Sequence, residues 1–573
     1  MLFVNAFFIL WDKNIRRVSV MRFSKIMLAS MGVLLTASVG HSIATNDVAA
    51  QDDEGLDINI GLMIDPVSMD PHTANDIPSA QIRTQLYDTL VKQDFELEIV
   101  EGLATEWEQV DDNTWSFTLR EGVTFHDGTD FTAEDVQATL ERILDPTAAA
   151  PVRFMFEMIT EIEAVDDYTL EITTEYPFAP LLSNLSHNTA GILSKDTIDE
   201  DYQNAIDEAG LEITLDEFYE MREAGGEEFE EVSAEMTEFV GNFLASNPVG
   251  TGHLQFVSRS PGDNIVLEKF EDYYEEGREF GTVTYQVIPE NQPRLAELET
   301  GGIAISDSVD PVNMERIRNG DSTDIIDQEG LSMTYLAFNV ENELFDDVNV
   351  RHAISHALDR DGMINGLLDG RGIHASTHIA RTVNFHDESF EELAYDIETA
   401  QEFMANSDLP DGFSTTLWIS NSDTNRDLAQ YIQETLGEIN IDVTIEEYEF
   451  GTFLDMANSG THDMFMLQWI TVTGDADYGL YPMFHTDSQD GSGNRWLYSN
   501  PELDVELEGG RQASDEDERA AFYSEAQRIL LEDLPITPMY YSELGIGVNT
   551  DLISGVELDP VGIIRLENVT SPE

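Results

Sequence analysis

The sequence has no cysteine among its 573 residues. This absence excludes disulfide bonds, thiolate ligands for a metal and cysteine nucleophiles. It also excludes the lipid-modified cysteine by which many exported proteins are tethered to a membrane. Stability and chemistry must therefore come from other side chains.

Lysine and arginine are scarce: the chain has 28 of them against 113 aspartates and glutamates, a formal net charge of −85. Such a charge repels phosphate backbones and anionic lipid surfaces, so we expect no nucleic acid as a partner. Self-repulsion also destabilises a compact state unless salt screens it, and the Debye length falls to about 3 Å at 1 M salt. We therefore predict a halophilic, acidic protein.

Aromatic residues, in contrast, are plentiful, with 29 Phe, 18 Tyr and 6 Trp. Together with periodic apolar segments, they favour packed domains with an acidic surface over a disordered chain. The length exceeds what one hydrophobic core usually supports, so two or three domains are expected.

The N-terminus combines basic residues, an apolar run over residues 26–39 and small residues that end at Ala50. This pattern is typical of a signal peptide over residues 1–50, and Met21 is an alternative start. The apolar run is shorter than the roughly 20 residues that span a bilayer, which favours cleavage over an uncleaved anchor. No later stretch approaches that length. We expect a periplasmic or extracellular protein.

Strands and helices alternate along the remaining chain, which favours an α/β or mixed architecture. Thr132 is placed to cap a helix with apolar residues at helical spacing, and an Asp-Pro pair ends it. Residues 196–245 are rich in acids and predict surface helices. Further on, a helix stopped by Gly437 precedes an alternating strand at 441–445, and residues 464–469 read as a buried strand.

Catalytic motifs are missing from the sequence. It contains no G-x-S-x-G elbow, no H-E-x-x-H helix and no phosphate-cradling G-x-x-x-x-G-K-[ST] loop, so we do not expect an enzyme. His352 and His356 stand one helical turn apart, but both point away from the apolar stripe of their helix. A solvent-facing pair is favoured over a metal site.

The best binding candidate follows the buried strand that ends at Trp469. Asp475, Asp477 and Tyr478 come just after it, where open α/β sheets bind ligands at the carboxyl ends of their strands. Carboxylates would hold a cationic amine there, and Trp469 or Tyr478 would offer an aromatic face. The alternative is an acidic loop exposed to salt water.

Arg426 is a second candidate, because basic residues are the rarer signal in this chain. It stands near the start of a predicted helix, from which its planar guanidinium would reach a ligand carboxylate with two hydrogen bonds. The alternative is a surface ion pair.

Several motifs in a fixed order carry a family resemblance. The most specific stretch is L-R-E-G-V-T-F-H-D-G over residues 119–128, followed by T-A-E-D-V over 132–136. Further matches lie at 247–252, 337–339 and 350–360. These segments resemble the family 5 extracellular solute-binding proteins, the dipeptide- and oligopeptide-binding receptors of ABC importers. The chain departs from the family at His253-Leu254, where Pro-Tyr is usual, and in its enlarged acidic segment.

The resemblance implies an α/β, periplasmic-binding-protein-like fold of class II, cluster C: two lobes joined by crossing strands, with an extra domain on the first lobe. The implied boundaries are 1–50 for the signal peptide, 51–85 with 246–310 and 540–573 for lobe I, 86–245 for the extra domain, and 311–539 for lobe II.

For the site, the resemblance implies that Asp475 receives a peptide amino group and that Arg426 is placed like the carboxylate-binding arginine of dipeptide receptors. It further implies a monomer without a cofactor that closes around its ligand and docks on an ABC permease and its ATPase. Three alternatives stay open: the same receptor binding a nickel complex or an oligosaccharide, a secreted salt-tolerant hydrolase, and a surface interaction protein.

Overall fold

The computed structural model describes residues 55–572 with the exception of residues 276 and 490–492. The predicted signal peptide lies outside these residues. Within the described part of the chain, no helix is both long and apolar enough to cross a bilayer.

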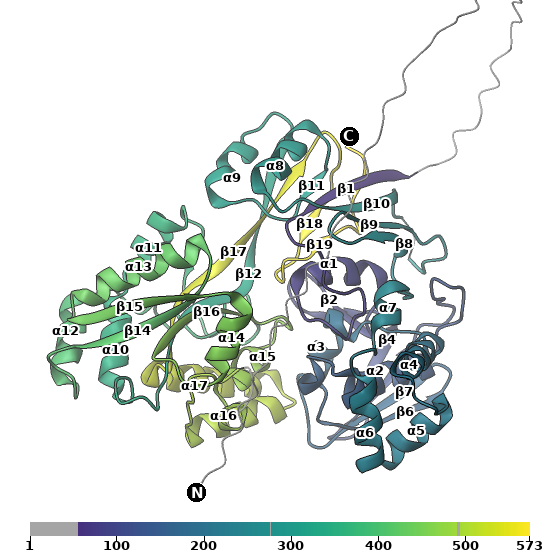
Figure 1. Ribbon diagram of the computed structural model, residues 1–573, viewed down its shortest axis with the longest axis horizontal. Helices are drawn as coiled ribbons and strands as arrows, with labels where there is room; N and C mark the ends of the chain where they lie inside the picture. The colour runs from purple at the N-terminus through teal and green to yellow at the C-terminus, as the bar shows by residue number, and fades with distance from the viewer. Residues whose placement is uncertain (1–54, 276, 490–492, 573) are drawn as a thin grey trace, which may run out of the picture. The chain divides into compact units, whose positions relative to one another are not determined.

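One large mixed sheet runs through the structure in the order β15-β14-β16-β12-β17-β11-β1-β10-β9-β8, with β13 also paired to β17 (Figure 1). Its strands are β1 Leu56–Leu62, β8 Leu254–Ser260, β9 Asn264–Lys269, β10 Phe280–Val287, β11 Ile305–Ser306, β12 Thr323–Phe338, β13 Ile373–His374, β14 Phe413–Ser420, β15 Ile441–Tyr448, β16 Met464–Ile470 and β17 Ile536–Asn549.

The two longest strands, β12 and β17, lie at the centre of this sheet. They pair antiparallel from Thr323 opposite Asn549 to Ala337 opposite Ile536, with an irregularity in register between Glu329 and Met333. Through β17 they join β11 and β1, and through β12 they join β16 and β14. The same pair of strands therefore belongs to both α/β parts of the protein.

Side chains alternate across the β12–β16 half of the sheet, and both faces are buried. Tyr335 and Phe465 pack into one core, whereas their neighbours Leu336 and Met466 pack into another. This is the pattern of strands covered by helices on both sides. The helices of this half are α10 Val348–Ala357, α11 Arg360–Leu367, α12 Ile397–Asn406, α13 Asp423–Gly437, α14 Phe450–Asn458, α15 Ala476–Phe484, α16 Pro501–Gln512 and α17 Glu516–Asp533.

A separate antiparallel sheet, β4-β5-β7-β6, follows the first strand of the chain. Helix α2 packs against it and buries Val136 and Leu140 among residues of β5 and β7. The predicted cap is confirmed, since Thr132 and Asp135 form a capping box and the helix ends before Asp145. The elements of this part are α1 Ile77–Leu86, β2 Val91–Gln93, β3 Ile99–Glu101, β4 Ala104–Gln109, β5 Thr114–Leu119, α2 Ala133–Leu144, β6 Ile159–Asp166, β7 Thr169–Thr174 and α3 Leu181–Leu185.

The acidic segment is helical, as predicted, but it is not merely a surface feature. Ile198, Tyr202 and Phe218 are buried in the same core as Ile58 of β1. This core therefore joins the predicted extra domain, residues 86–245, to strand β1 of the predicted lobe I. The domain boundaries given above stay a prediction. The remaining elements are α4 Lys195–Ala209, α5 Leu215–Ala224, α6 Glu227–Met236, α7 Asn242–Ser246, α8 Asn291–Thr300, α9 Pro311–Arg318, β18 Glu557–Leu558 and β19 Ile564–Arg565.

A fully buried ion cluster holds α2 and α4 to the segment before α1. Arg142 contacts the carboxylate of Asp70 at 2.7 Å and that of Asp201 at 3.0 Å, and it donates to His72 Nδ1 at 2.7 Å. Burial by itself would lower the pKa of Arg142, but the two carboxylates raise it above its usual value. Burial lowers the pKa of His72 to about 3, so this imidazole is neutral. We name Arg142, Asp70 and Asp201 the buried triad.

Candidate functional site

The loop that follows β16 is shaped by its sequence. Gly474 has φ 67°, the left-handed region that glycine adopts without strain, and it turns the chain out of the strand. Asp475 is then the N-cap of α15, because its carboxylate accepts a hydrogen bond from the backbone N–H of Asp477 at 2.9 Å. The alternation along β16 places Trp469 on the same face of the sheet as Phe465, against the core that residues of α15 also enter. Trp469 and Tyr478 are thereby brought together.

These two residues form one wall of a cavity of about 760 Å³. The ring centroids of Trp469 and Tyr478 lie 5.7 Å apart, and those of Phe154 and Tyr478 lie 5.8 Å apart. Trp469 Nε1 donates to the Tyr478 carbonyl at 3.2 Å. Further lining residues come from both regions: Asn75, Pro151, Met155, Glu157, Met158, Glu175, Tyr176, Phe178 and Asn184 on one side, and Asp477, Tyr481, Pro482, Asp487, Ser488, Gly493 and Arg511 on the other. A cavity of this size and aromatic character suits a small organic ligand.

Asp477 lines this cavity, but its carboxylate is already paired. Both oxygens accept hydrogen bonds from Arg511, each at 2.9 Å. Arg511 stacks over the Tyr481 ring at 3.4 Å from its centroid. Burial alone would lower the pKa of Arg511, yet Asp477 raises it above the usual value, so the guanidinium stays charged. Its two hydrogen bonds to Asp477 leave it little capacity to bind a ligand carboxylate.

Asp475 is also paired, and it is buried. Arg519 of α17 donates to its carboxylate at 2.9 Å, and the same oxygen caps α15. Asp475 is not among the residues that line the cavity. In this structure the carboxylate holds the loop onto α17, and its role as the receiver of a peptide amino group stays a prediction.

Arg426 is not brought together with the other predicted site residues. It lies in the first turn of α13 and pairs with Asp423 at 2.7 Å and with Glu447 of β15 at 2.6 Å, all three at the surface. β15 is an edge strand of the large sheet. Arg426 is therefore found in a surface ion pair, the alternative weighed from the sequence, and not in the wall of the cavity.

The histidine pair of α10 is half-buried and does not face solvent freely. His352 and His356 both stack on Phe403 of α12, at 5.0 and 5.6 Å between ring centroids. Each also contacts a backbone carbonyl at 2.9 Å. The expected solvent-facing pair is thus a packing contact between two helices. Among the described residues there is no group of three or more metal-ligating side chains.

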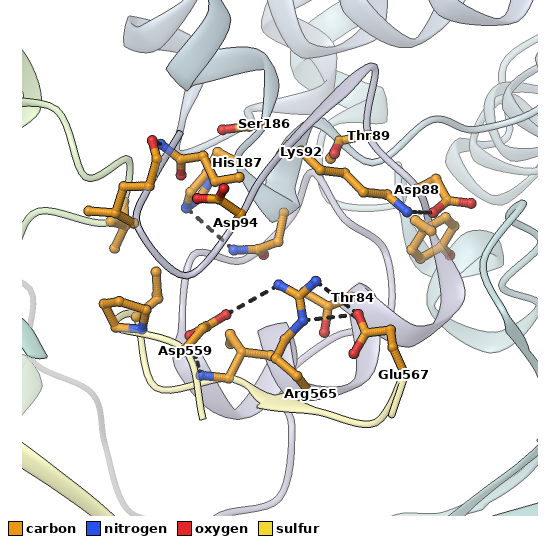
Figure 2. Close-up of a pocket in the computed structure, with 18 of the residues that line it drawn as sticks. Thr84, Asp88, Thr89, Lys92, Asp94, Ser186, His187, Asp559, Arg565 and Glu567 are labelled. Carbon is orange, nitrogen blue, oxygen red and sulfur yellow. Dashed lines mark hydrogen bonds and ion pairs between the residues drawn. The ribbon is translucent and has the colours of Figure 1, made fainter. Parts of the chain in front are cut away.

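Two smaller cavities adjoin the main one through shared residues. One of about 220 Å³ shares Asn75, Trp469 and Tyr478 with it. The next, of about 100 Å³, shares His187 and Asn188 with the second. Figure 2 shows the third cavity, with an arginine held between two carboxylates and a lysine directed at a third. Each cavity thus shares wall residues with the next, so the three cavities are neighbours.

Sequence reasoning missed the partners that complete this site. Arg511 and Arg519 follow Asp477 and Asp475 by 34 and 44 residues, and no local pattern links them. Phe154 and Tyr176 come from the region of the small sheet, on the far side of the cavity. The only sequence signal for these pairs is the scarcity of basic residues, which makes each arginine of the chain a candidate partner for the acidic loop.

The comparisons with known proteins cover most of the chain. It is 26% identical to the glutathione-binding protein GsiB of Pectobacterium atrosepticum over 88% of this chain and 92% of the relative. It is 27% identical to the dipeptide-binding protein of Escherichia coli, over 85% of this chain and 89% of the relative. Among solved structures it is similar to the ABC transporter-associated periplasmic binding protein DppA of Helicobacter pylori in complex with the peptide STSA, at 27% identity and a TM-score of 0.75, over 91% of this chain and 99% of the other.

These likenesses confirm the predicted α/β periplasmic-binding-protein fold with its additional antiparallel part. The family match runs over residues 98–491, which is more than half of the chain. It includes the small sheet, the central strand β12 and the aromatic wall at Trp469 and Tyr478. The chain belongs to the bacterial extracellular solute-binding proteins of family 5, which are receptors rather than enzymes.

Proposed function

We propose that this protein captures a peptide outside the cytoplasm and delivers it to the permease and ATPase of an ABC importer. The observation that carries the proposal is the cavity of about 760 Å³, whose walls come from the small-sheet region on one side and from β16 and α15 on the other. A ligand in such a cavity touches both walls at once. Contacts made only when the walls are close favour the closed form, which is the form an importer recognises.

The names of the relatives support a peptide-like ligand. One curated relative is a dipeptide-binding protein, another binds glutathione, and one solved relative holds a peptide of four residues. A site walled by aromatic rings with few fixed polar groups accommodates variable side chains by contact area. The given sequence has no cysteine that could carry a lipid, and the predicted signal peptide fits release into a periplasm or the medium.

Thermal unfolding tests this function directly. The purified protein is heated in high salt with dipeptides, longer peptides, nickel complexes and oligosaccharides, because a ligand that binds only the native state raises the melting temperature. A saturable rise with peptides supports the proposal. A rise with sugars or metal complexes and none with any peptide would overturn it.

Two variants tie binding to the cavity. Tyr478→Ala removes an aromatic wall residue and should weaken peptide binding by at least about tenfold, the scale of losing a buried aromatic contact. Arg426→Ala is the matched control, because Arg426 lies in a surface ion pair outside the cavity. If Arg426→Ala weakened binding and Tyr478→Ala did not, the ligand would sit elsewhere.

A further inference from the structure

The cavity has an unusual balance of charge. Arg511 is the one lysine, arginine or histidine among the described residues that line it, and Asp477 occupies its guanidinium with two hydrogen bonds. Glu157, Glu175 and Asp487 also line it, and all three are exposed at the rim. Apart from the Asp477–Arg511 pair, the charged residues of the described lining are all acidic.

The adjoining cavities offer no free cation either, within the part of the chain that the structure describes. In the third cavity Arg565 lies between Glu567, at 2.8 Å, and Asp559, at 3.6 Å, and Lys92 contacts Asp88 at 2.6 Å (Figure 2). His187 and His253 also line it, and burial lowers the pKa of each to about 3, so both are neutral. Each ligand carboxylate that enters these cavities would therefore leave water without a free positive partner, so a carboxylate in addition to the C-terminal one of a peptide adds a further cost.

A ligand cation, in contrast, finds two kinds of partner. Glu175 and Asp487 have no side-chain hydrogen bond or ion pair to other described residues, whereas Glu157 has a long contact of 3.4 Å to Arg153. The faces of Trp469, Tyr478 and other aromatic residues attract an ammonium or guanidinium group. They also cover the aliphatic stem of a lysine or arginine side chain while its charged end stays at the rim.

We propose that this cavity selects peptides with a net positive charge and rejects glutathione. This inference rests on the proposed function, because it concerns which peptides the receptor takes. Glutathione has two carboxylates for one ammonium group, so it brings more negative than positive charge into a negative site. Lys-Phe-Lys brings two side-chain ammonium groups to the acidic rim and a ring to the aromatic wall.

Isothermal titration of the purified full-length protein with matched tripeptides tests the selection. Lys-Phe-Lys should bind at least about tenfold more tightly than Ala-Phe-Ala, since ammonium groups gain both cation–π and carboxylate contacts. Glu-Phe-Glu and glutathione should give no heat of binding. Glutathione binding as tightly as Lys-Phe-Lys would overturn the inference. Equal binding of all three tripeptides would also overturn it and leave the peptide receptor standing, whereas failure of every peptide would remove the proposed function itself.

A double variant locates the source of the preference. Glu175→Gln with Asp487→Asn should weaken Lys-Phe-Lys about fivefold and leave Ala-Phe-Ala unchanged, because both side chains are exposed and the substitutions keep their size. Glu171→Gln is the matched control, since Glu171 lies on β7 near Glu175 but does not line the cavity. An unchanged Lys-Phe-Lys affinity in the double variant would contradict the role of the rim.

Discussion

Arg142 and Arg426 occupy opposite kinds of environment in the same acidic protein. Arg142 is fully buried and holds two carboxylates from different elements in the buried triad. Arg426 is exposed and holds two carboxylates at the surface. In water the second arrangement contributes little, whereas removing one partner from the first leaves uncompensated buried charge. For these two arginines, the expected contribution to stability therefore depends on burial and not on the number of carboxylate partners.

The largest effect is expected from Arg142→Met. Asp70 and Asp201 would then lie buried without a positive partner, and the free energy of unfolding should fall by about 3 to 5 kcal/mol. Denaturant unfolding of the variant and the parent at pH 7.5 measures the difference. Arg142→Lys, which keeps the charge but not the planar fork, should lose less. A loss of the same size at Arg426→Ala would abolish the contrast.

An intermediate effect is expected from Arg519→Met, because Arg519 and Asp475 are buried but hold a loop and not a whole interface of helices. The unpaired Asp475 carboxylate should cost about 2 kcal/mol of stability. Peptide affinity should also fall, since the loop places Tyr478 in the cavity wall. Adding Asp475→Asn to Arg519→Met should restore part of the lost stability. The free energies of unfolding of the two single variants and the double variant give the coupling energy between the two side chains. Additive losses would show that the pair does not act as a unit.

Buried histidines extend the comparison to basic side chains that burial keeps neutral. Burial lowers the pKa of His253 to about 3 from its usual 6.5. As the pH falls from 6.5 towards 3, the unfolded imidazole binds a proton that the folded one does not, so the native state loses stability over this window. The contribution of His253 should fall by about 1 kcal/mol between pH 6.5 and 5.5. His253→Gln, which cannot be protonated, should show a smaller loss of stability over that step. Equal slopes for variant and parent would refute the assignment.

The smallest effect is expected from Arg426→Ala. Its guanidinium and both partners are exposed to solvent, and salt screens them further. We expect no measurable change in melting temperature in 2 M salt. A clear loss would mean that the edge strand β15 depends on this pair.

The local parts of the fold could be predicted because their signals lie within a few residues. The helix over residues 133–144 carries its own cap, and Gly437 ends α13 as its position indicates. Likewise, the strand predicted at 464–469 matches β16 almost to the residue, although only its first three residues are fully buried. Periodicity and capping are properties of neighbouring residues, so one sequence suffices to see them.

The site was predicted only in part, for a related reason. Trp469 and Tyr478 were predicted together because a strand and its following loop place both at one edge of the sheet, and both line the large cavity; that the ligand binds there stays a prediction. The pairing of Asp475 and Asp477 with arginines of α16 and α17 depends on how those helices pack back on the loop. A carboxylate in a promising loop looks free in a sequence, and only the tertiary structure shows that it is already occupied.

The position of β12 and β17 at the centre of the sheet has a consequence for how the chain folds during its synthesis. β1, at the start of the described chain, pairs with β10 and β11, and β11 in turn pairs with β17 near the C-terminus. Gln81 of α1 also binds the backbone at Gly562 and Ile564. The native sheet therefore cannot close until almost the whole polypeptide has been synthesised. Until β17 emerges, the strands of the two halves can pair only among themselves, and the sheet that joins them stays incomplete.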